Sequence, residues 1–64
     1  MKLYEYYSMD YSTRYQIGER LDGARFERAR KKTPWGYTWS RWFQIKTLPN
    51  EARLIKESAK IKIG

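Results

Sequence analysis

Residues 24–47, ARFERARKKTPWGYTWSRWFQIKT, contain the strongest local folding signal in the chain. Thr33-Pro34-Trp35-Gly36 has proline at the second position and glycine at the fourth, the pattern of a type I turn. The residues from Tyr37 onward are rich in β-forming types. We therefore predict an antiparallel hairpin with strands at about residues 24–32 and 37–47.

The four-residue turn also sets the register of this hairpin. It places these residues opposite each other: Arg30 and Trp39, Arg28 and Arg41, Phe26 and Phe43, and Ala24 and Ile45. We expect the apolar pairs to lie in the core and the arginine pairs at the rim. Residues 24–32 have an alternative as a short basic helix, because ARFERARKK also has high helix propensity.

The tyrosine-rich segment 2–9 is predicted to be a strand. Residues 10–21 fit two patterns. A strand would alternate Tyr11, Thr13, Tyr15 and Ile17, whereas a helix would be capped by Asp10 and closed by Gly23, with a stripe of Tyr11, Tyr15 and Leu21. Gly18 weakens the helical pattern, so we prefer the strand.

Residues 50–60 are predicted to form a helix, capped by Asn50 or Thr47. Its apolar half would contain Ala52, Leu54, Ile55, Ala59 and Ile61. The predicted fold class is therefore α+β: one compact domain over residues 1–64, with an antiparallel sheet of three or four strands and this helix packed on one face. Lys60 to Ile63 also alternates, so the chain has a short terminal strand as an alternative.

A basic hairpin followed by one docked helix, over residues 23–60, resembles the arm-binding domains of phage integrases and AP2-type DNA-binding domains. The resemblance is one of architecture and implies a DNA-binding module. No diagnostic motif accompanies it, so no binding residue is carried over and no family is assigned.

The composition lacks the residues that most catalytic sites use. The 64 residues include no cysteine and no histidine, which removes disulfides, thiolate or imidazole metal sites and the familiar nucleophile–base pairs. The acid pair Glu19 and Asp22 lies beside Arg20 and Gly23, and we interpret it as a solvated turn. We predict a binding protein that is not an enzyme and uses no cofactor or metal.

The charge predicts a polyanionic partner. The net charge is +7, and residues 23–46 hold seven basic residues against the single acid Glu27. Nucleic acid is the commonest such partner, and we prefer DNA over RNA. The residues expected to contact phosphates are Arg25, Arg28, Arg30, Lys31, Lys32, Arg41 and Lys46.

Aromatic side chains beside these cations can stack on bases or wedge between them. Trp35 is expected at the tip of the turn, and Trp42 shares its face of the predicted strand with polar residues. We therefore assign both tryptophans to the binding site. Trp39, Phe43 and Phe26 are expected in the core.

A protein partner is the alternative. The tyrosines exceed what one small core can bury, so Tyr4, Tyr6 and Tyr7, together with Trp42, are candidate contacts with a protein partner or within a homodimer. The second function hypothesis is a small inhibitor or adaptor, of the kind found in phages and mobile elements, that docks on an acidic surface of a larger protein. No secretory signal or membrane span is recognised, so we expect a cytoplasmic protein without a membrane partner or a small-molecule substrate.

Overall fold

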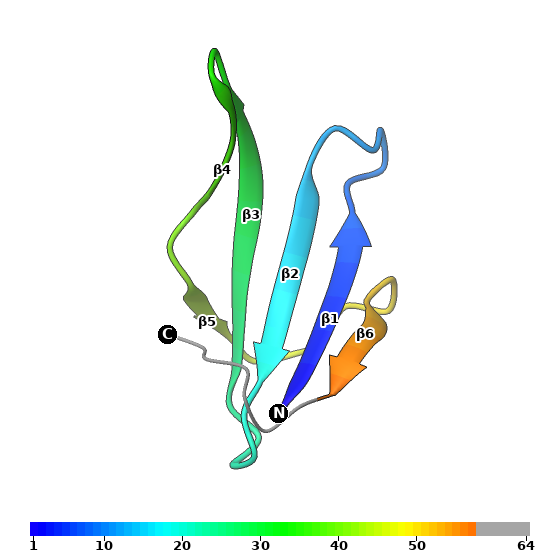
Figure 1. The fold of residues 1–64 in the computed structure, drawn as a ribbon. Helices are drawn as coiled ribbons and strands as arrows, with labels where there is room; N and C mark the ends of the chain where they lie inside the picture. Colours follow the sequence, from blue (N-terminus) through cyan, green and yellow to red (C-terminus); the bar gives the residue numbers. More distant parts are fainter. Residues whose placement is uncertain (58–64) are drawn as a thin grey trace.

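The computed structural model describes residues 1–57, and these form one six-stranded antiparallel sheet (Figure 1). The strands are β1 (Lys2–Tyr7), β2 (Arg14–Glu19), β3 (Arg25–Thr33), β4 (Gly36–Trp39), β5 (Phe43–Ile45) and β6 (Arg53–Glu57). Their order is β4-β3-β2-β1-β6, and β5 also pairs with β3. The first four strands form a meander, and the last returns to the free edge of β1.

Aspartate side chains organise the two turns of the meander that join β1 to β2 and β2 to β3. The Asp10 carboxylate accepts a hydrogen bond from the Ser12 amide at 3.0 Å. Asp22 accepts one from the Ala24 amide at 3.0 Å, and Gly23 between them has a φ of 89°, which favours glycine. The strand prediction for residues 2–9 and the preferred strand within residues 10–21 are confirmed by β1 and β2.

The β3–β4 hairpin has the predicted turn. Thr33 pairs with Gly36, and the Thr33 hydroxyl accepts a hydrogen bond from the Trp35 amide at 3.3 Å and donates one to the Gly36 carbonyl at 3.0 Å. Gly36 has a φ of 132°. Arg30 lies opposite Trp39 as expected. The alternative of a basic helix over residues 24–32 is wrong, because this segment is the longest strand of the sheet.

The predicted register fails beyond Trp39. The Ala29 amide donates to the Ser40 hydroxyl at 2.9 Å, so the serine side chain replaces a backbone carbonyl and interrupts the ladder. Pairing resumes in β5 with a shift of one residue, and Phe43 lies opposite Glu27. The predicted pairs Phe26–Phe43, Ala24–Ile45 and Arg28–Arg41 are therefore wrong; the observed β5 pairs are Glu27–Phe43, Phe26–Gln44 and Arg25–Ile45.

The predicted C-terminal helix is also wrong within the described residues. Arg53–Glu57 is strand β6, and residues 1–57 contain no helix, so this part of the chain is all-β instead of α+β and has more strands than predicted. The architectural resemblance to integrase arm-binding and AP2-type domains fails with it. Residues 58–60 of the predicted helix and the alternative strand over residues 60–63 lie outside the described residues.

Pairing with β1 accounts for the strand conformation of β6. The edge of β1 offers unpaired backbone groups, and the register brings opposite charges together: Lys2 faces Glu57 and Glu5 faces Arg53. A partner strand with matched charges outweighs the helix propensity of the segment. None of the described residues forms a helix with the length and apolarity needed to span a membrane.

Alternation along the strands gives the sheet two different faces. We name them the arginine face, which carries Arg14, Gln16, Arg28, Arg30, Tyr37 and Trp39, and the tyrosine face, which carries Tyr4, Tyr6, Tyr15, Ile17, Glu27 and Ala29. Ile17, on the central strand β2, is fully buried at 0% exposure. Phe43 was predicted to be core and is 57% exposed, whereas Trp39 and Phe26 are half-buried.

Candidate nucleic-acid interface

Strand β3 divides the basic run predicted to bind phosphate. Arg28, Arg30 and Lys32 alternate onto the arginine face, and Arg25 and Lys31 onto the opposite face. The run is therefore two basic rows on one strand. Both arginines of the row on the arginine face, Arg28 and Arg30, contact aromatic rings.

Arg28 is held by four contacts on the arginine face. Its Cζ lies 4.3 Å from the ring centroid of Trp39 and 4.6 Å from that of Trp42. Its Nε and Nη2 donate to Gln16 Oε1 at 3.0 and 2.7 Å. Burial lowers the pKa of the Arg28 guanidinium, which remains charged because an arginine pKa is far above neutrality. Arg28 is thus engaged inside the protein and stabilises the sheet.

Trp42 does not take the position that strand alternation predicted. Because the strand breaks at Ser40, Trp42 is not held on the face opposite Trp39. Both indole rings contact Arg28 instead, and Trp42 is half-buried. Trp42 is therefore a packing partner of Arg28 as well as a candidate binding residue.

Arg30 and Arg14 also lie over aromatic rings on this face. Arg30 Cζ is 4.2 Å from the centroid of the Tyr37 ring. Arg14 Cζ is 5.9 Å from that of Trp39, and Arg14 also forms an ion pair with Glu5, in which Nε lies 2.9 Å from Oε2. Arginine over an aromatic face is stabilised by cation–π attraction. The arginine face is thus built from guanidinium groups packed on rings.

The free end of the β3–β4 hairpin extends beyond β2. The last β2–β3 pair joins Arg14 and Arg30, so within the described part of the chain residues 31–33 and 36–38 pair only with each other. Figure 1 shows this part of the hairpin projecting at the top of the sheet. Trp35 at its tip is 93% exposed, and Lys31 and Lys32 beside it are exposed as well. This projecting end, residues 31–38, is named the hairpin arm.

The other predicted phosphate contacts lie away from the arm. Arg25 forms an ion pair with Glu19 at 2.8 Å, and its Nη1 donates to the Lys46 carbonyl at 3.3 Å. Lys46 and Arg41 are exposed, and Arg41 Cζ lies 6.0 Å from the Phe43 ring centroid. The structure therefore brings Lys31, Lys32 and Trp35 together at the arm, and Arg28, Arg30 and Trp42 on the arginine face. It places Arg25 at the β5 end of β3, with Arg41 before β5 in the chain and Lys46 directly after it.

The sequence prediction missed Arg14, Gln16 and Tyr37 as members of the arginine face. Their place depends on the β2–β3 register, in which Arg14 faces Arg30 and Gln16 faces Arg28. By contrast, alternation along a strand was enough to predict from the sequence that Arg28 and Arg30 lie on the same face. An available signal was Tyr37, which immediately follows the turn and must therefore lie near the lysines.

Few of the basic side chains of residues 1–57 form ion pairs. Two ion pairs are present among residues 1–57, Arg14–Glu5 and Arg25–Glu19. The acid pair Glu19 and Asp22 serves structural roles, since Glu19 binds Arg25 and Asp22 closes a turn. The lysines of the hairpin arm take part in neither ion pair.

No protein-family model, curated protein or solved structure matches the chain. The chemistry of the hairpin arm and the arginine face is therefore the basis for assigning a function.

Proposed function

We propose that this protein binds nucleic acid, with duplex DNA preferred over RNA, through the hairpin arm. The observation that carries the proposal is the projection of residues 31–38 beyond β2, with Lys31, Lys32 and Trp35 exposed at its end. The proposed role is that of a binding protein in the cytoplasm, without catalytic chemistry of its own.

The shape of the arm supports the preference for DNA. The major groove of B-form DNA is wide enough to admit a two-stranded β-ribbon. The major groove of A-form RNA is too deep and narrow for side chains to read. A projecting two-stranded ribbon is therefore better matched to duplex DNA than to duplex RNA.

The basic residues have two proposed roles: some contact phosphate, and Arg28 supports the hairpin arm. Lys31 and Lys32 supply phosphate contacts at the arm, and the exposed Arg41 and Lys46, before and after β5, add further positive charge. Arg28 supports the arm from the arginine face, because its guanidinium is occupied by Gln16 and two indole rings. The exposed Trp35 would stack on bases or wedge into a groove.

The test is a fluorescence-anisotropy titration of labelled duplex DNA, single-stranded DNA and duplex RNA across a salt series. Wild-type protein should bind duplex DNA most tightly. Removing two phosphate contacts with Lys31→Ala/Lys32→Ala should flatten the slope of log affinity on log salt by about 1.8. Trp35→Ala should weaken binding and leave that slope unchanged, because an indole releases no counterions.

The matched control is Lys2→Ala/Lys56→Ala, which removes the same charge from β1 and β6. It should leave the slope close to that of the wild type. Equal losses in the two double variants would show that only net charge matters and would overturn the arm as the binding site. Absence of binding to every nucleic acid at about 50 mM salt, where phosphate contacts are strong, would overturn the proposed function.

A further inference from the structure

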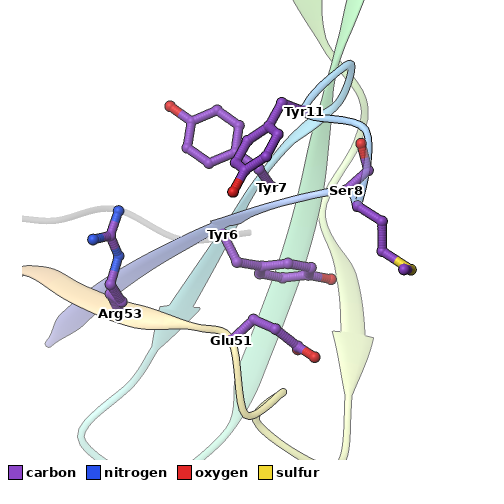
Figure 2. Close-up of a pocket in the computed structure, with 7 residues that line it drawn as sticks. Tyr6, Tyr7, Ser8, Tyr11, Glu51 and Arg53 are labelled. Carbon is purple, nitrogen blue, oxygen red and sulfur yellow. The ribbon is translucent and has the colours of Figure 1, made fainter.

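A pocket on the tyrosine face has a chemistry opposite to that of the hairpin arm. It measures about 380 Å³ and is lined by Tyr6, Tyr7, Ser8, Met9, Tyr15, Glu27 and Glu51. An adjoining pocket of about 350 Å³ shares five of these residues and adds Tyr11 and Arg53 (Figure 2). The first pocket thus contains two carboxylates and no basic residue.

Two stacked tyrosines form a flat aromatic wall of this pocket. The rings of Tyr6 and Tyr15 lie with their centroids 4.7 Å apart and their planes at 11°. The Tyr6 hydroxyl donates a hydrogen bond to Glu27 Oε1, which fixes the ring relative to β3. Burial and this hydrogen bond raise the pKa of Tyr6, as do the negative charges of Glu27 and Glu51. The hydroxyl therefore stays protonated, and both carboxylates act on the same ring.

Neither carboxylate has an ionic partner in the described part of the chain. The ion pairs found there involve Glu5 and Glu19, although the protein as a whole carries a net charge of +7. Glu27 is half-buried and Glu51 is exposed, and both line the pocket. Figure 2 shows Glu51 extending in the same direction as the Tyr6 ring, while Arg53 points away from it. The pocket is therefore a local negative site on a positive protein.

We propose that this pocket binds an organic cation, an alkylammonium or guanidinium group such as a lysine or arginine side chain of a protein partner. Aromatic faces attract cations, and a desolvated cation over a ring gains more than an exposed one. The stacked tyrosines supply that surface, the exposed Met9 adds a polarisable contact for an alkyl chain, and Glu27 and Glu51 supply the countercharge. This site is independent of the nucleic-acid proposal, since none of the residues that line it belongs to the hairpin arm.

The test titrates the intact chain with the peptide acetyl-Gly-Lys-Gly-amide at constant ionic strength, followed by proton–nitrogen NMR correlation spectra. Saturable shifts should gather at the amides of Tyr6, Tyr15 and Glu51. The same peptide with an acetylated lysine should cause none, because it has no charge. If the lysine peptide binds more tightly than n-butylammonium, the ligand is a side chain of a protein partner. If the two bind equally, the ligand is a free organic cation. Either result supports the site.

Paired variants separate the pocket from general electrostatics. Glu51→Gln should weaken binding by about fivefold, the upper range for one exposed charge pair. Glu57→Gln removes the same charge from β6 outside this pocket and should leave binding unchanged. The proposal is overturned if the acetylated peptide produces the same shifts, if no shift saturates, or if the two variants weaken binding equally.

Discussion

Arg28 and Trp39 are diagonal neighbours across β3 and β4: Trp39 pairs with Arg30, yet its ring centroid lies 4.3 Å from Arg28 Cζ. The contact spans two residues along the strand, which a long side chain can reach. It links the base of the hairpin arm to the central sheet, because Arg28 is also bonded to Gln16 on β2. The following predictions test this and other contacts that hold the sheet together.

Arg28→Ala is expected to lower the free energy of unfolding by about 2 kcal/mol, because it removes two cation–π contacts and leaves Gln16 Oε1 without its donor. The free energy of unfolding of Arg28→Lys should lie between those of the wild type and Arg28→Ala, since an ammonium cannot reproduce the forked hydrogen bond. Urea unfolding followed by tryptophan fluorescence measures both. Lys32→Ala, exposed on the same strand, is the control and should change stability by less than about 0.5 kcal/mol. Equal losses at the two positions would contradict a structural role for Arg28.

Ile17→Ala should destabilise the protein by about 2–4 kcal/mol, and Ile17→Val by about 1 kcal/mol, because Ile17 is fully buried on the central strand. A domain of this size has little stability to spare, so the alanine variant should be largely unfolded. Circular dichroism and urea titration give the measurement. Leu54→Ala, at a side chain 50% exposed on β6, should have a smaller effect. A larger effect at Leu54 would place the main core elsewhere.

Alkaline pH should destabilise the sheet through Tyr6. Its pKa is raised in the folded protein by burial and by the Glu27 hydrogen bond, so the folded state favours the protonated hydroxyl. This contribution is fully present below the unfolded pKa of about 10 and is lost as pH rises toward the folded value. Urea unfolding at about pH 8 and pH 11 should show the loss. Tyr6→Phe should be less stable at the lower pH and lose less stability between the two. An unchanged pH dependence in Tyr6→Phe would assign the effect to other groups.

The carboxyl group of Asp10, in the β1–β2 turn, should have a pKa below that of an ordinary aspartate. Hydrogen bonds from the Ser12 and Ser8 hydroxyls and the Ser12 amide lower its pKa from 3.8 to about 2. Because the folded pKa is the lower one, the stabilisation is present above pH 3.8 and is lost as pH falls toward 2. Carbon NMR of the carboxyl group gives the midpoint. Ser12→Ala should raise it toward 3.8, and an unchanged midpoint would show that the serine hydroxyl is not the cause.

Local residue chemistry was sufficient to predict the β3–β4 hairpin. Pro34 and Gly36 determine the turn, and a two-residue connection leaves one way to pair Thr33 with Gly36 and Arg30 with Trp39. The register beyond the turn required knowledge that the Ser40 hydroxyl would bind the Ala29 amide. Serine is common in strands and turns alike, so its type does not reveal that bond. The contact of Trp42 with Arg28 followed from the same interruption and was not predictable.

The predicted helix failed because its evidence was local and the outcome was decided by a distant strand. Residues 50–60 have helix-forming side chains and an apolar half, but β1 had an unpaired edge that needed a partner. The clue was complementary charge, Glu5 with Arg53 and Lys2 with Glu57, which becomes visible only when the two segments are aligned antiparallel. Of the candidate site, the exposure of Trp35 followed from the turn. The partners of Arg28 depended on strand neighbours that composition does not specify.

The return of β6 to β1 has a consequence for the order of folding. The turns between β1 and β4 join neighbouring segments, whereas Tyr4 must find Leu54 near the other end of the described chain. Contacts between residues far apart in sequence require closure of a long loop and slow the folding of small proteins. The meander can therefore assemble first, with the outer edge of β1 bare until β6 arrives. Until then, a strand from another molecule can pair with the same edge of β1. The rate at which β6 closes onto β1, relative to the rate of association, therefore determines how much of the protein aggregates during folding.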